Sequence, residues 1–219
     1  MCGRFTQRKD ASKVAKRYGV SENGIVAKPR YNIAPQQMIL AVNQERELVQ
    51  LKWGLIPSWA KDAKIANNLI NARAETLQEK PSFRTALAKR RCLIPADGWY
   101  EWKKEADGKQ PYFFHRRDDG LFSFAGLWES WKSPEGDTIQ TCTIITTEPN
   151  ELTRQYHHRM PAILKPSDEQ HWLDSSARVP DLLQLLAPCS ADELEAYPIS
   201  RAVNSPGRDE NSLIERVQV

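Results

Sequence analysis

The chain has 219 residues, of which 40% are hydrophobic and 27% are charged, and its formal net charge is +3. This length suits one large domain or two small ones, and the apolar fraction lies well above the disordered range. No apolar run approaches the roughly 20 residues needed to cross a bilayer, and residues 1–10 contain no apolar stretch, so we expect neither a membrane span nor a secretory signal.

The first half of the chain predicts a short helix followed by extended segments. Asp10 is placed to cap a helix that runs to Tyr18, and Gly19 follows where such a helix would end. The other predicted elements here are an irregular segment framed by prolines at 29–35, a hairpin of strands at 38–43 and 48–53, and an aromatic loop at 53–60.

The second half predicts a helix, a series of strands and then further helices. The first helix begins near Pro81 and ends around Arg90. Strands are predicted at 92–95, 98–103, 112–115, 121–127 and 138–147. The later helix signals are Asn150 as a cap for a helix to about Tyr156, capping boxes at Ser167-x-x-Gln170 and Ser190-x-x-Glu193, and Pro180 in a first turn.

The order of these elements predicts the fold class. Strands in series, with helices inserted and appended, are typical of an α+β fold. The sequence contains no repeat and no linker, so we predict a single domain over residues 1–219. Its C-terminal part, about 166–219, is predicted to be helical and acidic.

Basic side chains are concentrated in the N-terminal half. Residues 1–30 carry eight basic and two acidic side chains, and residues 71–104 carry eight basic and four acidic ones. From residue 166 onward there are four basic and ten acidic side chains. A basic region of this kind indicates a polyanion partner, because each phosphate contact releases counterions. A solvated surface with accidental charge segregation is the alternative interpretation.

The cysteines and histidines do not have the spacing of a metal site. No C-x-x-C pair occurs, and the adjacent His157 and His158 lack the i, i+4 spacing of helix-borne ligands. The cysteines, too few for a disulfide scaffold, are Cys2, Cys92, Cys142 and Cys189. We expect reduced thiols, no metal, no cofactor and a cytoplasmic protein, associated with the nucleoid if it is bacterial.

Cys2 would be the N-terminal residue once Met1 is removed, as happens generally when the second residue is small. Its α-amine would then have an ordinary pKa of about 7.7–8.0 and its thiol about 8.5, so both would be partly nucleophilic near neutral pH. Such a pair is suited to aldehydes, because the amine forms an imine and the thiol closes a five-membered thiazolidine ring. The same thiol could instead act in amide hydrolysis, or be an inert exposed cysteine.

Two other segments carry candidate catalytic groups. Asn71, Arg73 and Glu75 share one face if their segment is extended. Glu101 lies between two tryptophans on a predicted strand. An interior position would raise its pKa and suit it to acid–base catalysis, whereas an outward position would pair it with Lys103 or Lys104.

The pair His157-His158 follows a predicted helix and precedes an apolar run. Loops at such boundaries often carry catalytic residues, although either histidine could simply lie on the surface.

Six blocks of the sequence, taken in order, are distinctive. They are Cys2–Phe5, Tyr31–Pro35, Trp53–Trp59, Asn71–Thr76, Arg91–Trp102 and His157–Pro161. Together they resemble the signature of the SRAP family, the SOS-response-associated peptidases now understood as abasic-site processing proteins. The resemblance extends to about Asn204. It implies a compact α+β domain around a curved, barrel-like, mainly antiparallel sheet with peripheral helices and a basic groove.

The resemblance implies four catalytic residues. Cys2 would form a thiazolidine crosslink with the ring-opened aldehyde of an abasic site in single-stranded DNA, shielding the site during the DNA damage response. Asn71 would hold the N-terminus and the sugar, and Glu101 would move protons during ring opening and closure. His157 would assist imine chemistry, strand cleavage by an associated lyase activity, and reversal of the crosslink. Self-removal of Met1 would be the peptidase activity.

The resemblance also implies contacts with the DNA strand. Arg4 and Arg73 would clamp phosphates, and Trp59 would stack on a base. Pro35 and Arg159 are the further DNA-binding candidates. Some relatives carry a second tryptophan after the position of Trp59, where this chain has Ala60. The implied partner is single-stranded DNA with abasic sites, without metal, cofactor or membrane, and we expect a monomer.

Two other functions stay open from the sequence alone. One is a cysteine peptidase or amidohydrolase that acts on other proteins, with Cys2 as nucleophile, His157 as base and Glu101 as the orienting group. The other is a reader that binds single strands noncovalently. The basic N-terminal half and Trp59 favour a DNA function over the peptidase, and the penultimate cysteine favours covalent chemistry over the reader.

Overall fold

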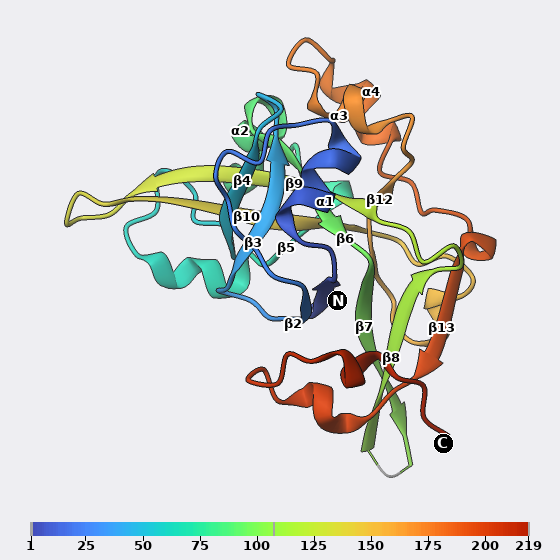
Figure 1. Cartoon of the computed structure of the whole chain (residues 1–219). Coiled ribbons are helices and arrows are strands. Elements are labelled where there is room, and N and C mark those ends of the chain that lie inside the picture. Colours follow the sequence, from blue (N-terminus) through green and yellow to red (C-terminus); the bar gives the residue numbers. More distant parts are fainter. Residues whose placement is uncertain (1, 107, 219) are drawn as a thin grey trace.

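A closed barrel of five strands lies at the centre of the computed structural model, which describes residues 2–106 and 108–218 (Figure 1). The ring of pairings runs β10–β4–β3–β6–β9 and closes between β9 and β10. All of these pairs are antiparallel except β4 with β10. The barrel strands are β3 (Met38–Asn43), β4 (Leu48–Trp53), β6 (Arg91–Ala96), β9 (Phe122–Lys132) and β10 (Thr138–Thr147).

Three short strands extend the barrel at its margins. Strands β5 (Asn71–Arg73) and β11 (Met160–Pro161) pair with β10, and β12 (Ile163–Leu164) pairs with β9. The β5 pairing is parallel to β10. These additions bring the segment that begins at Asn71 and the segment that follows His157 to the same strand, β10.

A second, antiparallel sheet of five strands continues from the barrel. Its order is β13–β8–β7–β1–β2. The strands are β1 (Phe5–Gln7), β2 (Arg30–Ile33), β7 (Gly98–Glu105), β8 (Gly108–Arg116) and β13 (Leu194–Pro198). In Figure 1 the β7–β8 hairpin extends downward beside the C-terminal segment, and the long β9–β10 hairpin projects to the left. The catalytic candidate Cys2 lies shortly before β1, which pairs with both β2 and β7.

The chain passes from the barrel into the second sheet at Asp97 and Gly98. The buried Asp97 carboxylate accepts hydrogen bonds from the Thr6 hydroxyl at 2.6 Å and from the backbone N–H of Arg8 at 2.7 Å. A Cβ atom on Gly98 would lie 2.2 Å from the Phe113 ring, so only glycine fits there. This bend directs the following residues, up to Glu101, past the N-terminal segment.

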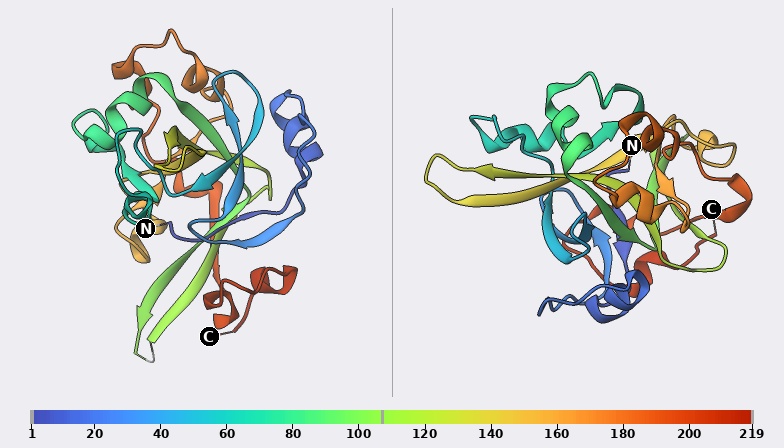
Figure 2. Two further views of the ribbon diagram at one scale, coloured as in Figure 1. Left: turned by 90° about the vertical axis from the view of Figure 1, so that its left-hand side faces the viewer. Right: turned by 90° about the horizontal axis from the view of Figure 1, so that it is seen from above.

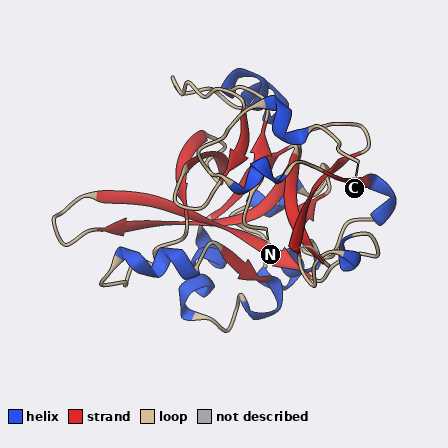
Figure 3. Ribbon diagram, turned by 90° about the horizontal axis from the view of Figure 1, so that it is seen from below, coloured by secondary structure: helices blue, strands red, loops and turns tan. Residues whose placement is uncertain are grey.

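The helices lie at the periphery, around the sheets (Figures 2 and 3). Helix α1 begins after Asp10, whose carboxylate accepts from the Lys13 N–H at 2.9 Å, and ends at Gly19, which has φ +63°. The helices are α1 (Ala11–Tyr18), α2 (Pro81–Lys89), α3 (Glu169–Leu173) and α4 (Val179–Gln184). The 3-10 helices are η1 (Ala63–Asn68), η2 (Ala74–Thr76), η3 (Thr153–Gln155), η4 (Ala191–Glu193), η5 (Arg201–Asn204) and η6 (Asn211–Ile214).

The structure confirms the α+β class and the barrel-like, mainly antiparallel sheet, and it corrects several local predictions. The C-terminal part is not wholly helical, because β13 joins the second sheet by pairing with β8. The two predicted capping boxes do not form. Asp168 and not Ser167 precedes α3, and Ser190 precedes a 3-10 helix without capping it by its side chain. Asn150 does accept from the Thr153 N–H, but only a 3-10 turn follows.

The barrel interior is filled by aromatic and aliphatic side chains, and this core reaches the N-terminal segment. Phe5 of β1 meets Trp53 of β4 edge-on at 5.2 Å and Phe124 of β9 at 5.8 Å between ring centroids. Cys2 belongs to the same buried cluster and is fully inaccessible to solvent. Burial of β1 therefore fixes the residues before it against the barrel.

Candidate active site

Cys2 is held at the boundary between the barrel and the second sheet. Its carbonyl oxygen accepts a 2.8 Å hydrogen bond from Asn71 Nδ2, and its thiol lies 3.9 Å from the Arg4 carbonyl oxygen. That carbonyl also accepts from the Tyr100 N–H at 3.0 Å, which continues the β1–β7 pairing. Burial, and next the charge of Glu101, raise the pKa of the Cys2 thiol. Met1, whose removal we expect, lies outside the described residues.

Asn71 reaches Cys2 because β5 lies alongside β10, with Asn71 opposite Ile144. The Ile144 N–H donates to the Ile70 carbonyl at 3.1 Å and fixes the start of this strand. Within the described part of the chain, Asn71 Oδ1 is buried and has no hydrogen-bond partner. The Asn71 amide thus holds Cys2 through Nδ2, and its Oδ1 can accept a hydrogen bond from an N–H or O–H group of a substrate beside Cys2.

Glu101 is buried, with 3% of its surface exposed, so the interior alternative of the sequence analysis is the one observed. It follows Trp99 and Tyr100 on β7, and both of these rings are also buried. Burial raises the pKa of Glu101 to about 7. Both its acid and base forms are therefore populated near neutral pH, as proton transfer requires.

His157 lies in the loop between η3 and β11. Its backbone N–H donates to the Thr153 carbonyl at 2.9 Å, and its ring stacks on His158 at 4.3 Å between centroids. His157 Nδ1 lies 3.0 Å from the Arg159 backbone nitrogen and 3.2 Å from the Arg159 carbonyl oxygen, so the tautomer decides its role. When Nδ1 carries the proton and donates it to that carbonyl, Nε2 of the neutral ring is the proton acceptor. Burial lowers the pKa of His157 to about 4, so the imidazole is neutral at pH 7.

Glu101 and His157 line one cavity of about 490 Å³. Asn71 binds the Cys2 backbone, and the charge of Glu101 acts on the Cys2 thiol. The four predicted catalytic residues therefore meet in one region, although they come from the N-terminal segment, β5, β7 and the His157 loop. They are separated by up to 155 positions in the sequence.

The predicted DNA-contacting side chains divide into exposed and internally bonded ones. Arg73 is exposed at the end of β5 and lines a second cavity, of about 660 Å³, that also includes His157. Trp59 is 57% exposed, in a loop that Trp131 fixes by donating from Nε1 to the Ala60 carbonyl at 2.7 Å. Pro35 is half-buried in the connection between β2 and β3.

Arg159 is buried and its guanidinium is occupied by protein groups. It forms a two-pronged ion pair with Glu75, at 2.7 and 2.9 Å, and donates to the Thr146 carbonyl at 2.6 Å. A phosphate would have to replace Glu75 to contact Arg159. Glu75 itself lies in η2 and faces Arg159. The extended segment in which it would share one face with Asn71 and Arg73 does not form, because β5 ends at Arg73.

Arg4 is attached to a C-terminal strap, which we define as residues 200–214. Its Nη1 donates to Asn32 Oδ1 at 2.6 Å and to the Val203 carbonyl at 2.8 Å. Arginine has five N–H donors, so part of the guanidinium is left for a phosphate. The strap is fixed in turn by Asp209, whose carboxylate accepts from the Asn32 N–H at 3.0 Å.

Asn32 is a site residue that the sequence analysis missed. Its buried side chain accepts from Arg4, and its Nδ2 donates to strap carbonyls, with the shortest distance, 2.7 Å, to Arg208. The two partners lie 28 and 176 positions away. No local pattern could have indicated them, although Asn32 does fall within one of the six distinctive blocks.

We expect Asn32→Ala to lower the free energy of unfolding by about 2–3 kcal/mol, because it removes one of the two acceptors of Arg4 and the hydrogen bonds that Asn32 Nδ2 donates to strap carbonyls. Urea denaturation of the variant beside the wild type measures this, with the exposed Asn67→Ala as a control that should change the value by less than about 0.5 kcal/mol. Equal stability of all three proteins would contradict a role for Asn32 in fixing the strap.

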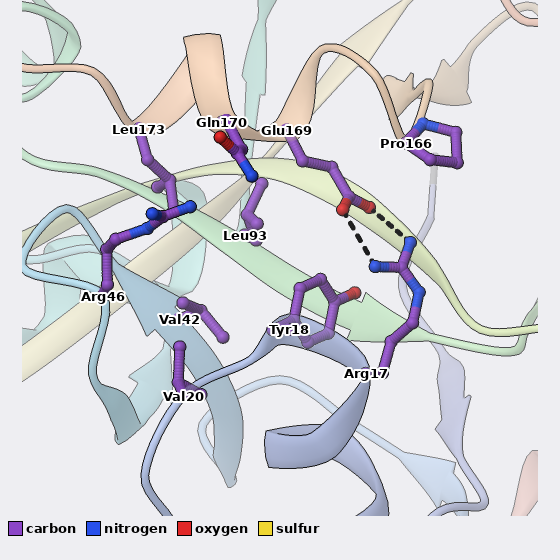
Figure 4. A pocket seen from close by; sticks show the side chains of 10 residues that line it. All are labelled: Arg17, Tyr18, Val20, Val42, Arg46, Leu93, Pro166, Glu169, Gln170 and Leu173. Carbon is purple, nitrogen blue, oxygen red and sulfur yellow. Dashed lines mark hydrogen bonds and ion pairs between the residues drawn. The ribbon is translucent and has the colours of Figure 1, made fainter.

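A separate cavity of about 150 Å³ lies between α1 and α3 (Figure 4). Arg17 and Glu169 form a two-pronged ion pair across its edge, at 3.0 and 3.1 Å, and the Ser123 hydroxyl donates to the same carboxylate at 2.7 Å. None of its lining residues belongs to the candidate site. The network joins α1, β9 and α3 and is structural.

Two kinds of feature are absent from the described residues. They contain no helix long and apolar enough to span a membrane. They also contain no group of three or more His, Cys, Asp or Glu side chains arranged to hold a metal ion.

The fold and the site together define a class of protein in which a buried cysteine follows the initiator methionine. Three groups surround this cysteine: the amide of Asn71, the carboxyl group of Glu101 with its raised pKa, and the neutral imidazole of His157. The family described as SOS response associated peptidase (SRAP) matches residues 1–206. The chain belongs to the SRAP family.

Similar proteins agree with this assignment over nearly the whole chain. The abasic site processing protein YoqW of Bacillus subtilis (strain 168) is 47% identical, over 98% of this chain and 99% of its own length. The abasic site processing protein HMCES of Gallus gallus is 34% identical over 83% of this chain and 64% of its own length. A crystal structure of a protein from Bacteroides thetaiotaomicron matches with a TM-score of 0.91 and 31% identity, covering 99% of this chain and 100% of that one.

Proposed function

We propose that this protein captures abasic sites in single-stranded DNA by forming a covalent crosslink between Cys2 and the ring-opened sugar. The observation that carries the proposal is the meeting of Asn71, Glu101 and His157 around Cys2. The relatives named as abasic site processing proteins support the substrate, since one of them is 47% identical along almost its full length.

The crosslink forms in three steps. The sugar of an abasic site opens from its cyclic hemiacetal to an aldehyde. The α-amine of Cys2, exposed by loss of Met1, adds to the aldehyde carbon, and water leaves as an imine forms. The thiol sulfur then adds to the imine carbon and a proton passes to the nitrogen, which closes the thiazolidine ring. No oxidant or reductant is needed, and ring closure is fast because it is intramolecular.

The neighbouring groups serve these steps. Glu101, with its pKa of about 7, removes and returns protons during sugar opening and loss of water. Neutral His157 accepts a proton at the imine stage, where loss of a C2′ proton expels the 3′ phosphate and gives the lyase activity. Asn71 holds the Cys2 backbone and offers Oδ1 to the new amine or to a sugar hydroxyl.

The release of Met1 completes the proposed activity. It requires hydrolysis of the Met1–Cys2 peptide bond, either by the Cys2 thiol itself, which is the self-processing peptidase activity, or by a methionine aminopeptidase. Mass spectrometry of protein made with the Cys2→Ser substitution distinguishes the two routes, because a fully retained Met1 there supports self-processing.

Single-stranded DNA is the proposed partner because an abasic residue has no base to read and a duplex would have to be kinked to bring its sugar to a buried cysteine. Arg73 and Arg4 provide phosphate contacts. Trp59 provides a stacking surface and Pro35 provides an apolar contact. Arg159 contributes only if a phosphate displaces Glu75. We propose that the protein acts as a monomer in the cytoplasm, associated with the nucleoid if it is bacterial.

A denaturing gel tests the proposal. The purified protein is mixed with an abasic oligonucleotide, with the same oligonucleotide carrying an intact base, and with an analogue whose aldehyde has been reduced to an alcohol. We expect a shifted, denaturation-resistant band with the first alone. A shift seen only on a native gel would leave noncovalent reading, and no shift together with cleavage of a peptide substrate would favour the peptidase.

We expect Arg73→Ala to weaken binding to single-stranded DNA at all sequences and to reduce the slope of log K against log[salt] by about 0.7, the value for one lost phosphate contact on a single strand. Fluorescence anisotropy across a salt series measures the slope. Lys16→Ala, which removes an exposed charge on α1, is the matched control and should leave the slope unchanged. Equal slopes for all three proteins would remove Arg73 from the proposed contacts.

A further inference from the structure

The cavity of about 490 Å³ that contains Glu101 and His157 has three further walls that the proposed chemistry does not use. They are Trp102 on β7, Lys109 on β8 and Asn204 at the end of η5. The cavity therefore lies between the β7–β8 hairpin, the His157 loop and the C-terminal strap. In Figure 1 the hairpin and the strap lie side by side at the bottom. Its volume is within the range of small-ligand sites, about 300–1,000 Å³.

Trp102 is fixed yet still accessible. Its indole Nε1 donates to Asn204 Oδ1 at 2.8 Å, and the side chain is half-buried. Asn204 is held in place because Val203, beside it in η5, is buried in a cluster with Tyr100 and Phe113. A tryptophan whose ring is oriented before a ligand arrives loses little entropy on stacking, so it is a good platform for an aromatic ligand.

A cation stands at the same cavity. Lys109 is exposed on β8, where it lies opposite Lys104 in the hairpin register. A stacking ring beside a flexible ammonium group is the combination by which proteins bind one nucleotide of a single strand, through base and phosphate together. The lysine contributes a point charge that attracts a phosphate without requiring a fixed geometry.

The position of His157 relates this cavity to the reacting sugar. His157 lines both this cavity and the cavity of about 660 Å³ that includes Arg73 and Arg154. A strand whose abasic sugar is bound at Cys2 must leave the site in two directions. Since His157 lines both cavities, the arginine-lined one is the candidate path for one end of the strand and the cavity of Trp102 and Lys109 for the other.

We propose that the Trp102 cavity binds the nucleotide immediately next to the abasic site on one side, its base stacked on Trp102 and its phosphate close to Lys109. This inference rests on the proposed capture of abasic sites and adds a subsite for one flanking nucleotide. The stacked base anchors the strand and holds the adjoining aldehyde near Cys2 and Glu101.

The test combines truncated substrates with variants of the cavity. Three abasic oligonucleotides are used: one with nucleotides on both sides of the abasic residue, one with nucleotides only on its 5′ side and one only on its 3′ side. Crosslinking rates at low protein concentration are measured for the wild type, Trp102→Ala, Trp102→Phe and Lys109→Gln. Lys104→Gln is the matched control, because it makes the same charge change in the same hairpin but does not line the cavity.

We expect Trp102→Ala to slow crosslinking about tenfold with the two-sided oligonucleotide and with one of the one-sided ones, as loss of a stacked base implies. With the other one-sided oligonucleotide, which lacks the nucleotide for this cavity, the variant and the wild type should react equally. Trp102→Phe should keep most of the rate, Lys109→Gln should lose about threefold in the same substrate-dependent way, and Lys104→Gln should match the wild type.

An equal loss with all three oligonucleotides would overturn the subsite and leave Trp102 a structural residue. No loss with any of them, in both Trp102→Ala and Lys109→Gln, would overturn it as well. Because Lys109 is exposed, its variant tests the subsite even if Trp102→Ala does not fold. If the wild type crosslinks to none of the three, the proposed function itself fails, which separates that failure from failure of the subsite.

Discussion

Cys2→Ala should reduce formation of the denaturation-resistant DNA adduct more than about a thousandfold, the scale on which removing a catalytic nucleophile acts. The variant keeps an N-terminal α-amine after loss of Met1, so it can still form an imine with the aldehyde. It has no sulfur to close the ring, and water reverses the imine. We therefore expect no band on a denaturing gel unless borohydride is present to reduce the imine to a stable amine.

The control for this experiment is Cys189→Ala. Cys189 is likewise a buried free thiol, but its backbone carbonyl bonds to Asn150 and it lies near Arg116 and Glu193, outside the candidate site. This variant should crosslink like the wild type. A stable adduct with Cys2→Ala in the absence of reductant, or loss of the adduct with Cys189→Ala, would be incompatible with a thiazolidine at Cys2.

Glu101→Gln should slow crosslinking by about a hundredfold to a thousandfold, because the amide keeps the shape of the carboxyl group but cannot transfer a proton. The wild-type rate should show an inflection near pH 7, where Glu101 titrates, and the variant should lack it. Single-turnover rates from pH 5 to pH 9 measure both effects. The same inflection in both proteins would assign it to another group, and an unchanged rate would remove Glu101 from the mechanism.

The same substitution has a pH-dependent effect on stability. The pKa of Glu101 is raised from about 4.5 in the unfolded chain to about 7 in the folded protein, so the folded state binds more protons between these values. The stability that Glu101 contributes is complete below about pH 4.5 and is lost as pH rises to about 7. Glu101→Gln should accordingly gain up to about 3 kcal/mol relative to the wild type between pH 4 and pH 8. Equal pH dependence in thermal melts of both proteins would contradict burial of an ionisable Glu101.

Local signals in the sequence predicted the longer strands and helices correctly, but strand β2 (Arg30–Ile33) forms where an irregular segment was predicted. Helix α1 is bounded by Asp10 and Gly19 as expected, because a carboxylate cap and a left-handed glycine act over only a few residues. The predicted strands all exist, but β9 extends to Lys132, beyond the expected end at residue 127. Pairing with β10 stabilises these additional residues, in which apolar and polar side chains are mixed. The capping boxes failed because α3 begins after Asp168, one residue beyond Ser167, and because Ser190 precedes only a short 3-10 helix that leads directly into β13.

The candidate site was predicted less completely than the fold. The sequence indicated Cys2, Asn71, Glu101 and His157, and the structure brings these four into one region. It could not indicate that Arg159 pairs with Glu75 or that Arg4 is fixed by Asn32, because these partners are 84 and 28 positions apart.

The sequence by itself determined the chemistry available to this protein: a penultimate cysteine, a basic N-terminal half and the residue types of six ordered blocks. Only the tertiary structure decided how those groups behave. Burial beside the barrel raises the pKa of Glu101 to about 7 and lowers that of His157 to about 4, which makes one an acid–base group and the other neutral at pH 7. The physical reason is that desolvation depends on what surrounds a side chain in space, and those surroundings come from strands far apart in the chain.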